Sequence, residues 1–196
     1  MKKTKIQKIN NLIAFDQSSE IQNVLFHPEF PFGCLDNVTY LDPEVQKFVY
    51  HNQDKFGEID PNTQYGFFHM IYGNNEILSP FYETVIPILE SFKDKTSVKV
   101  KKIIRIRIRM TTKVSNESIK NYPHVDGKDP HKVLIYYVND SDGDTFFYKR
   151  NKNNLEETLR ISPSMGSAVF FDGSIYHASS TPSKTSRRIT INFNFE

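Results

Sequence analysis

The segment 188–195 alternates strictly between polar and apolar residues, and this alternation constrains the fold more than any other feature of the sequence. In an extended strand, side chains two positions apart point to the same face. One face of this segment is therefore apolar and the other polar. The apolar residues are Ile189, Ile191, Phe193 and Phe195, and the polar residues are Arg188, Thr190, Asn192 and Asn194. We expect the apolar face to pack on helices and the polar face to line a cavity.

Other strand-like segments precede this one, with turn residues between them. The segment 104–110 alternates isoleucine with arginine, so its isoleucines are expected to face a core. Segments rich in β-branched and aromatic residues follow at 133–138, 145–148, 159–161, 168–171 and 175–177. Two more strands are expected at 23–26 and 66–72, and an exposed loop at 149–154. Short strands with frequent turn signals indicate an all-β sandwich or barrel.

Two helices are expected in the first half of the chain. The first is 42–49, because Asp42 is a good N-cap residue and Pro43 suits the first helical position. The second is 80–92, where apolar residues recur every three or four positions. Pro87 lies inside this second helix, so a kink or a break is expected there.

Length and composition describe an ordinary globular protein. The chain has 196 residues, of which 38% are hydrophobic and 24% charged. A single domain is expected over residues 1–196, with a core at about 96–196 and an N-terminal elaboration of helices and strands at about 1–95. One cysteine and a polar N-terminus predict a cytoplasmic protein. The sequence leaves the oligomeric state open.

The net charge of +2 gives no support for a nucleic-acid or membrane-surface partner. For this reason the three arginines of the segment 104–110 are interpreted as a solvated or ion-paired sheet face rather than a nucleic-acid groove.

A candidate metal site is formed by His124, Asp126 and His177. The first two lie two positions apart, so both side chains point to one place if their segment is extended. Two histidines and one carboxylate on one face of an octahedron are the ligand set of non-haem Fe(II) oxygenases. Each piece alone has a simpler interpretation, since a lone His-x-Asp is usually a surface pair and a lone histidine is usually packed. The remaining histidines, His27, His51, His69 and His131, are interpreted as structural or surface residues.

A basic residue near the C-terminus completes the pattern. A 2-oxo acid that chelates iron needs an anchor for its far carboxylate, and the planar fork of arginine suits that task. Arg188 can return to the site on a neighbouring antiparallel strand, and Thr190 shares its face. Arg187 competes for the same role, although the alternation of the last strand favours Arg188.

The order of these motifs resembles the 2-oxoglutarate and Fe(II)-dependent dioxygenases, most closely the prolyl 4-hydroxylase-like branch. The resemblance covers about residues 121–195. It rests on His124-Val125-Asp126, the segments 135–139 and 142–147, His177 and Arg188-Ile189-Thr190. The fold that it implies is mainly β with supporting helices, a double-stranded β-helix (a cupin-like jelly roll). The chain departs from the branch at Asp142-Gly143, where two glycines usually stand.

The resemblance also implies roles for single residues. It implies that His124, Asp126 and His177 bind iron, and that Arg188 pairs with the carboxylate of 2-oxoglutarate. Tyr137 is the expected hydrogen-bond donor to this cosubstrate. Tyr136 competes with Tyr137 for that role.

The implied reaction converts 2-oxoglutarate and dioxygen to succinate and carbon dioxide while a carbon–hydrogen bond is hydroxylated. The expected cofactors are Fe(II), 2-oxoglutarate and dioxygen, with ascorbate as a further candidate. A prolyl residue in a peptide or protein is the expected substrate, and a small molecule stays open. The alternatives are a non-catalytic jelly-roll module that binds a metal or ligand, and a zinc hydrolase with the same three ligands. Neither alternative requires a dicarboxylate anchor.

Overall fold

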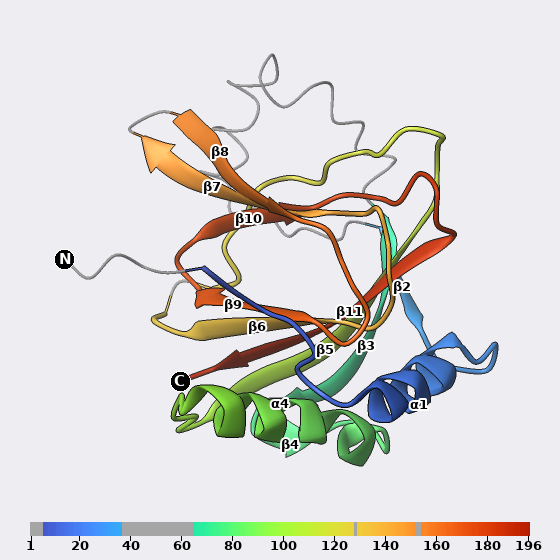
Figure 1. Cartoon of the computed structure of the whole chain (residues 1–196), viewed down its shortest axis with the longest axis vertical. Coiled ribbons are helices and arrows are strands. Elements are labelled where there is room, and N and C mark those ends of the chain that lie inside the picture. The colour runs from blue at the N-terminus through green and yellow to red at the C-terminus, as the bar shows by residue number, and fades with distance from the viewer. Residues whose placement is uncertain (1–5, 37–64, 128, 152–153) are drawn as a thin grey trace.

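Two antiparallel sheets face each other in the computed structural model, and two helices cover the outer side of the larger sheet (Figure 1). The structure describes residues 6–36, 65–127, 129–151 and 154–196. The helices are α1 (Phe15–Phe26) and α4 (Tyr82–Thr96). The strands are β1 (Gln7–Ile9), β2 (Gly33–Leu35), β3 (Gly66–Gly73), β4 (Glu76–Ile77), β5 (Ile103–Thr112), β6 (Lys132–Tyr137), β7 (Thr145–Asn151), β8 (Asn154–Ile161), β9 (Ala168–Asp172), β10 (Tyr176–Ser179) and β11 (Arg187–Phe195).

The strand order is that of a jelly roll. The larger sheet runs β1-β9-β6-β11-β5-β3-β2, with β4 paired to β3, and the smaller sheet runs β10-β7-β8. Two isolated bridges, Lys120 to Ser180 and His124 to His177, attach the segment before β6 to the free edge of β10. From β5 onward the chain crosses repeatedly between the two sheets: the segment before β6, the hairpin β7–β8 and β10 join the smaller sheet, while β5, β6, β9 and β11 join the larger one. The expected double-stranded β-helix is confirmed.

Strand β11 lies between β5 and β6, and its apolar and polar residues lie on opposite faces of the sheet, as the sequence predicts. Its apolar residues Ile189, Ile191, Phe193 and Phe195 are all 0% exposed. They share one core cluster with α4, which contributes Val85, Ile88, Leu89 and Phe92. The opposite face of β11 points toward the smaller sheet, so the expected arrangement of an apolar outer face and a polar inner face is confirmed.

Helix α4 forms where the spacing of apolar residues predicts a helix, and it continues through Pro87 without a break. Proline removes a single amide donor, and the buried face of the helix still packs on the sheet around it. The helix ends at Ser97, which is left-handed (φ 57°) and donates its backbone N–H to the carbonyl of Lys93. No helix in the described part of the chain is long and apolar enough to cross a membrane.

Two expectations about local structure are wrong. The segment 23–26 is the last turn of α1 rather than a strand, because Ser18, Ile21 and Leu25 recur at helical spacing and are buried against the sheet. The segment 149–154 is not a simple loop, since β7 extends to Asn151 and β8 begins at Asn154. Cross-strand pairing thus includes the polar residues 149–151, although a polar segment of this kind is typical of a loop. The helix expected at 42–49 and His51 lie outside the described residues.

We predict that Phe92→Ala lowers the free energy of unfolding by about 3–5 kcal/mol, because it empties a filled position of the core. Phe92 is 0% exposed, and its ring centroid lies 4.9 Å from that of Phe170 and 5.9 Å from that of Phe195. Urea unfolding measures the change. Phe15→Ala is the control, since this side chain is 72% exposed and should change stability little. Equal effects of the two substitutions would contradict this account of the core.

Candidate metal centre

The backbone brings His124 and His177 together across the edge of the smaller sheet. The N–H of each residue donates to the carbonyl oxygen of the other, both at 2.9 Å. Residues that exchange both hydrogen bonds are directly opposite in an antiparallel pair, so their side chains emerge on the same face. The two imidazole centroids are 4.6 Å apart.

Local hydrogen bonds fix the orientation of both rings. Nδ1 of His124 lies 3.1 Å from the carbonyl oxygen of Tyr122, and Nδ1 of His177 lies 3.1 Å from that of Ile175. A carbonyl oxygen only accepts, so each Nδ1 carries the hydrogen of the neutral ring. The lone pair of each ring is then on Nε2, the atom on the side of Asp126.

Asp126 places its carboxylate opposite these two nitrogens. Its Oδ1 is 3.7 Å from Nε2 of His124 and 4.0 Å from Nε2 of His177, while Oδ2 accepts a 3.0 Å hydrogen bond from Asn194. Both separations to Oδ1 are too long for direct hydrogen bonds. They are shorter than the roughly 4.2 Å that two metal–ligand bonds of about 2.1 Å can span. The three ligand atoms all lie within 4.8 Å of one another, a spacing that fits one ion.

Burial and neighbouring charges keep these three groups in their metal-binding protonation states. Burial, reinforced by the charge of His177, lowers the pKa of His124 to about 3, and burial likewise lowers the pKa of His177. Burial would raise the pKa of Asp126, but His177, His124 and Arg105 outweigh it and lower that pKa below its usual range. Two neutral imidazoles and one carboxylate therefore face each other at neutral pH, as metal coordination requires.

The structure places Arg188 inside the jelly roll and Arg187 outside it. Arg188 is 5% exposed, and its Nη2 donates a 2.9 Å hydrogen bond to Oγ1 of Thr145. Tyr137 is fully buried and donates a 2.8 Å hydrogen bond to the same oxygen. Thr190, 1% exposed, lies next to Arg188 on the inner face of β11. Burial lowers the pKa of Arg188, and burial raises the pKa of Tyr137 to about 12, so the phenol is protonated at neutral pH.

The competing residues named from the sequence lie elsewhere. The guanidinium of Arg187 lies 4.7 Å from the ring centroid of Phe26, on the helical side of the larger sheet. The hydroxyl of Tyr136 donates to Ser18 of α1 at 3.1 Å. Both belong to the outer layer because each lies one position from an inward-facing residue, and successive side chains of a strand point to opposite faces.

Two contacts of this centre were not foreseen from the sequence. Asn194 holds the carboxylate of Asp126, and Arg105 of β5 lies 3.7 Å from the same group. Asn194 belongs to the polar face that the alternation of the last strand predicts, and that face is the signal that the sequence offers. Its contact with a residue 68 positions away depends on how the sheet closes.

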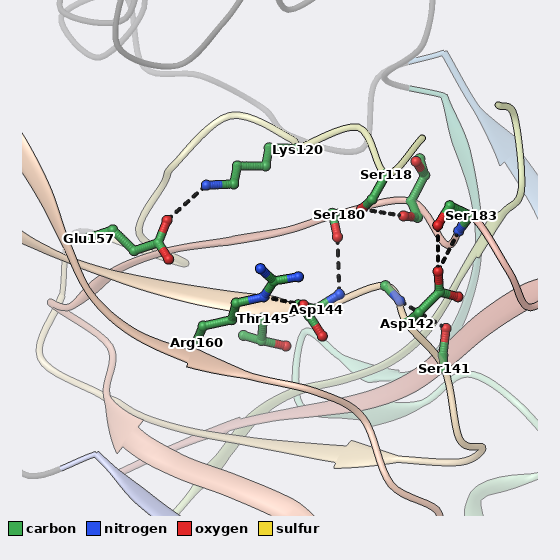
Figure 2. A network of polar contacts seen from close by, with 12 residues as sticks. Ser118, Lys120, Ser141, Asp142, Asp144, Thr145, Glu157, Arg160, Ser180 and Ser183 are labelled. Carbon is green, nitrogen blue, oxygen red and sulfur yellow. Dashed lines mark hydrogen bonds and ion pairs between the residues drawn. The ribbon is translucent and has the colours of Figure 1, made fainter. Parts of the chain in front are cut away.

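The Asp142-Gly143 turn is hydrogen-bonded through Asp142 to the segment that precedes β11 (Figure 2). Asp142 accepts five hydrogen bonds, from the backbone N–H groups of Ser183, Lys184 and Thr185 and from the hydroxyls of Ser183 and Thr185. A Cβ atom at Gly143 would lie 2.8 Å from the carbonyl oxygen of Ser180, so only glycine fits there. The carboxylate thereby positions the segment that leads directly into Arg187 and Arg188.

An ion pair supports the same turn from the other side. Asp144 pairs with Arg160 of β8, and its backbone N–H donates to the hydroxyl of Ser180 at 3.0 Å (Figure 2). The next residue, Thr145, is the one that contacts Arg188. The turn and its partners thus place the hydroxyl that orients the buried guanidinium.

No protein-family model matches this chain, and no curated protein matches it in sequence. Solved structures do resemble it. A prolyl-4-hydroxylase from Pseudomonas putida is similar with a TM-score of 0.53 at 10% identity, covering 99% of this chain and 93% of that one. A 2OG-Fe(II) oxygenase family oxidoreductase from Burkholderia pseudomallei gives 0.53 at 14% identity, covering 91% and 90%. The non-haem α-ketoglutarate-dependent epimerase SnoN from nogalamycin biosynthesis gives 0.57 at 8% identity, covering 99% and 79%. At these identities the likeness shows a shared fold.

We predict that Asp142→Asn destabilises the protein at neutral pH by about 1–2 kcal/mol, because an amide cannot accept all five hydrogen bonds. Burial would raise the pKa of Asp142, but the hydrogen bonds from Ser183, Thr185 and Lys184 outweigh it and lower that pKa. A lowered folded-state pKa means that the stabilisation is complete above the unfolded pKa of about 3.9 and disappears as pH falls further.

Urea unfolding of both proteins between pH 3 and pH 7 measures this difference, which should shrink toward the acid end. Asp94→Asn, at an exposed site near the end of α4, is the control and should show little change at any pH. A difference that stays constant with pH would show that the carboxylate charge is not what holds the loop.

Proposed function

We propose that this protein is a 2-oxoglutarate- and Fe(II)-dependent dioxygenase. The observation that carries the proposal is the convergence of His124, Asp126 and His177 in a jelly roll that also buries Arg188 on its inner side. The similarity of the fold to 2OG-Fe(II) oxygenases supports it. A metal site alone does not need a buried guanidinium, whereas a dicarboxylate cosubstrate does.

The donor atoms suit Fe(II). Nε2 of His124, Nε2 of His177 and one oxygen of Asp126 would hold the ion, with the remaining coordination positions open. Bound Fe(II) would activate dioxygen, so that one oxygen atom enters succinate, carbon dioxide leaves 2-oxoglutarate, and the other oxygen atom enters a carbon–hydrogen bond of the substrate. The chain's part is to keep both imidazoles neutral and to hold the carboxylate in place through Asn194.

Arg188 is the proposed anchor of 2-oxoglutarate. Its Nε is buried without a hydrogen-bond partner among the described residues, and its Nη2 is oriented by Thr145. A bidentate pair with a carboxylate would satisfy the open donor and neutralise the charge. Tyr137 and Thr190 on the same inner face would add hydroxyl groups to the cosubstrate pocket.

A prolyl residue in a peptide or protein is the proposed substrate. It is supported by the similarity to the Pseudomonas putida structure described as a prolyl-4-hydroxylase. The similarity to SnoN, an epimerase of nogalamycin biosynthesis, supports a small-molecule substrate as the alternative. Ascorbate is proposed as the reductant that sustains Fe(II) during turnover.

The direct test is formation of succinate from 2-oxoglutarate in the presence of Fe(II), dioxygen and ascorbate. We predict that the wild type forms succinate and binds one Fe(II) per chain. Asp126→Ala should lose most of the iron and all turnover, because the only anionic ligand is gone. Asn192→Ala, on the same inner face but not a ligand, should still bind iron. Stoichiometric Fe(II) in Asp126→Ala would refute the ligand assignment, and absence of both turnover and 2-oxoglutarate binding in the wild type would refute the function.

We predict that Arg188→Ala weakens 2-oxoglutarate binding by about tenfold to a hundredfold while iron binding persists, since a hydrogen bond to a charged group contributes about 1.5–3 kcal/mol. Arg188→Lys keeps the charge without the fork and should fall between the wild type and Arg188→Ala. Calorimetric titration of the Mn(II)-loaded proteins measures the affinity. Arg187→Ala is the matched control. If it shows the larger loss, the neighbouring arginine is the anchor.

A further inference from the structure

The inner face of β5 carries a row of three arginines, Arg105, Arg107 and Arg109, which the proposed chemistry does not use. Ile106 and Ile108, between them in sequence, are 0% exposed and pack in the outer core, so the arginines point to the inner face. In the sheet register they pair with residues of the inner face of β11: Arg105 with Asn194, Arg107 with Asn192 and Arg109 with Thr190.

Contacts at one end of the row place it beside the metal centre. Arg105 lies 3.7 Å from Asp126 and donates a 3.2 Å hydrogen bond to Asn194. At the other end, the charge of Arg109 acts on both His124 and His177 and lowers their pKa values. The row thus runs along the site from one side to the other. The sequence interpretation as an ion-paired sheet face holds for Arg105.

Positive charge exceeds negative charge on this face. With Arg188, four arginines line the inner side, and the carboxylate that acts on Arg105, Arg107 and Arg109 alike is Asp126. Asp144, near Arg188, already pairs with Arg160. Burial, with the charge of neighbouring arginines, lowers the pKa of Arg107 to about 10 and that of Arg109 to about 9. Both still carry full charge at neutral pH.

Arg107 is the member of the row with an unsatisfied donor and no ion pair among the residues that the structure describes. Its Nε is buried and has no hydrogen-bond partner there. Partial burial of a charge without a counter-charge opposes folding. Such a charge is compensated when an anion binds next to it, and the low dielectric around it strengthens that contact.

A cavity reaches this region from outside. It measures about 340 Å³, and its polar side includes Arg105, Asp126, Asp129, His131 and Asn194. Met70, Leu78 and Ile104 form its apolar side, and Met70 pairs with Arg107 in the register of β3 and β5. The volume is at the small end of ligand pockets, which suits a small molecule or a single side chain.

We propose that the substrate oxidised at this site carries a carboxylate, which Arg107 binds on the inner face of β5 with Arg105 at the mouth of the adjoining cavity. The inference rests on the proposed function, because it assigns 2-oxoglutarate to the metal and Arg188 and thereby leaves Arg107 for a second anion. The carboxylate belongs either to a small acid or to an acidic side chain of a peptide.

Pairs of probes that differ by a single carboxylate test the proposal and distinguish these two sources. The N-acetyl amino acids and their amides differ only in the α-carboxylate and represent small acids. Acidic side chains of a peptide are represented by two further pairs. One pair is N-acetylglutamate amide and N-acetylglutamine amide, and the other is N-acetylaspartate amide and N-acetylasparagine amide. The members of each pair differ only in the side-chain carboxylate. Thermal shift and calorimetry on the Mn(II)-loaded protein, saturated with 2-oxoglutarate, measure binding. We expect a carboxylate probe to bind at least tenfold more tightly than its neutral partner.

The assignment to Arg107 is tested with Arg107→Met. This variant should lose the tenfold preference for carboxylate while its 2-oxoglutarate affinity stays within about threefold of the wild type. Without ligands it should melt at the same temperature as the wild type or higher, because an uncompensated charge is gone. Arg187→Met is the matched control, since Arg187 contacts Phe26 on the outer side, and it should keep the preference.

Three results would overturn the inference. One is a wild type that binds 2-oxoglutarate and yet prefers no carboxylate probe, which leaves the proposed function intact. Another is a loss of 2-oxoglutarate affinity in Arg107→Met as large as that in Arg188→Ala. The third is an Arg107→Met protein that melts far below Arg187→Met, which would make Arg107 structural. Failure of the wild type to bind 2-oxoglutarate at all refutes the proposed function instead.

Discussion

The packing of the apolar face of β11 on helix α4 is the constraint from which the rest of the site follows. Because Ile189, Ile191, Phe193 and Phe195 are fully buried on that side, the residues between them must face the smaller sheet. A shift of one residue in the register of this strand would move Arg188 to the helical side. The hydrophobic core therefore sets which guanidinium lies inside, and it does so without any contact to a ligand.

The inner face departs from an ordinary protein interior in how its polar groups are arranged. On the β6 and β9 side it is apolar, with Tyr137 the polar exception, and it packs against Phe147 of the smaller sheet. On the β11 and β5 side it is lined by asparagines, threonine and arginines. Isolated charges in such a place are unfavourable, and the cation and anions proposed to bind here would compensate them. Asp126 lies between the two groups of residues, because its carboxylate faces both the histidines and Arg105.

Loops that carry no catalytic group also matter to the site. The carboxylate of Asp142 accepts hydrogen bonds from the segment 183–185. Gly143 lets the backbone pass close to Ser180 and to the side chain of Arg188. At the position before Gly143 this chain has a hydrogen-bond acceptor, Asp142. This acceptor therefore stabilises the turn while the course of the chain remains that of a jelly roll.

The three candidate metal ligands were predicted from the order of motifs along the chain, since His177 is far in sequence from His124 and Asp126. The sequence alone determined the mainly β class, most strands of the C-terminal half and helix α4, because each of these depends on local periodicity. The sequence misassigned two segments. Residues 23–26 are helical because α1 packs against the sheet, and 149–154 include strand residues because β7 and β8 pair with each other. Tertiary structure alone decided that Asn194 contacts Asp126 and that the β5 arginines lie beside the candidate metal centre. Those facts join residues that are far apart in the chain, and only the closure of two sheets around a common interior brings them within reach of each other.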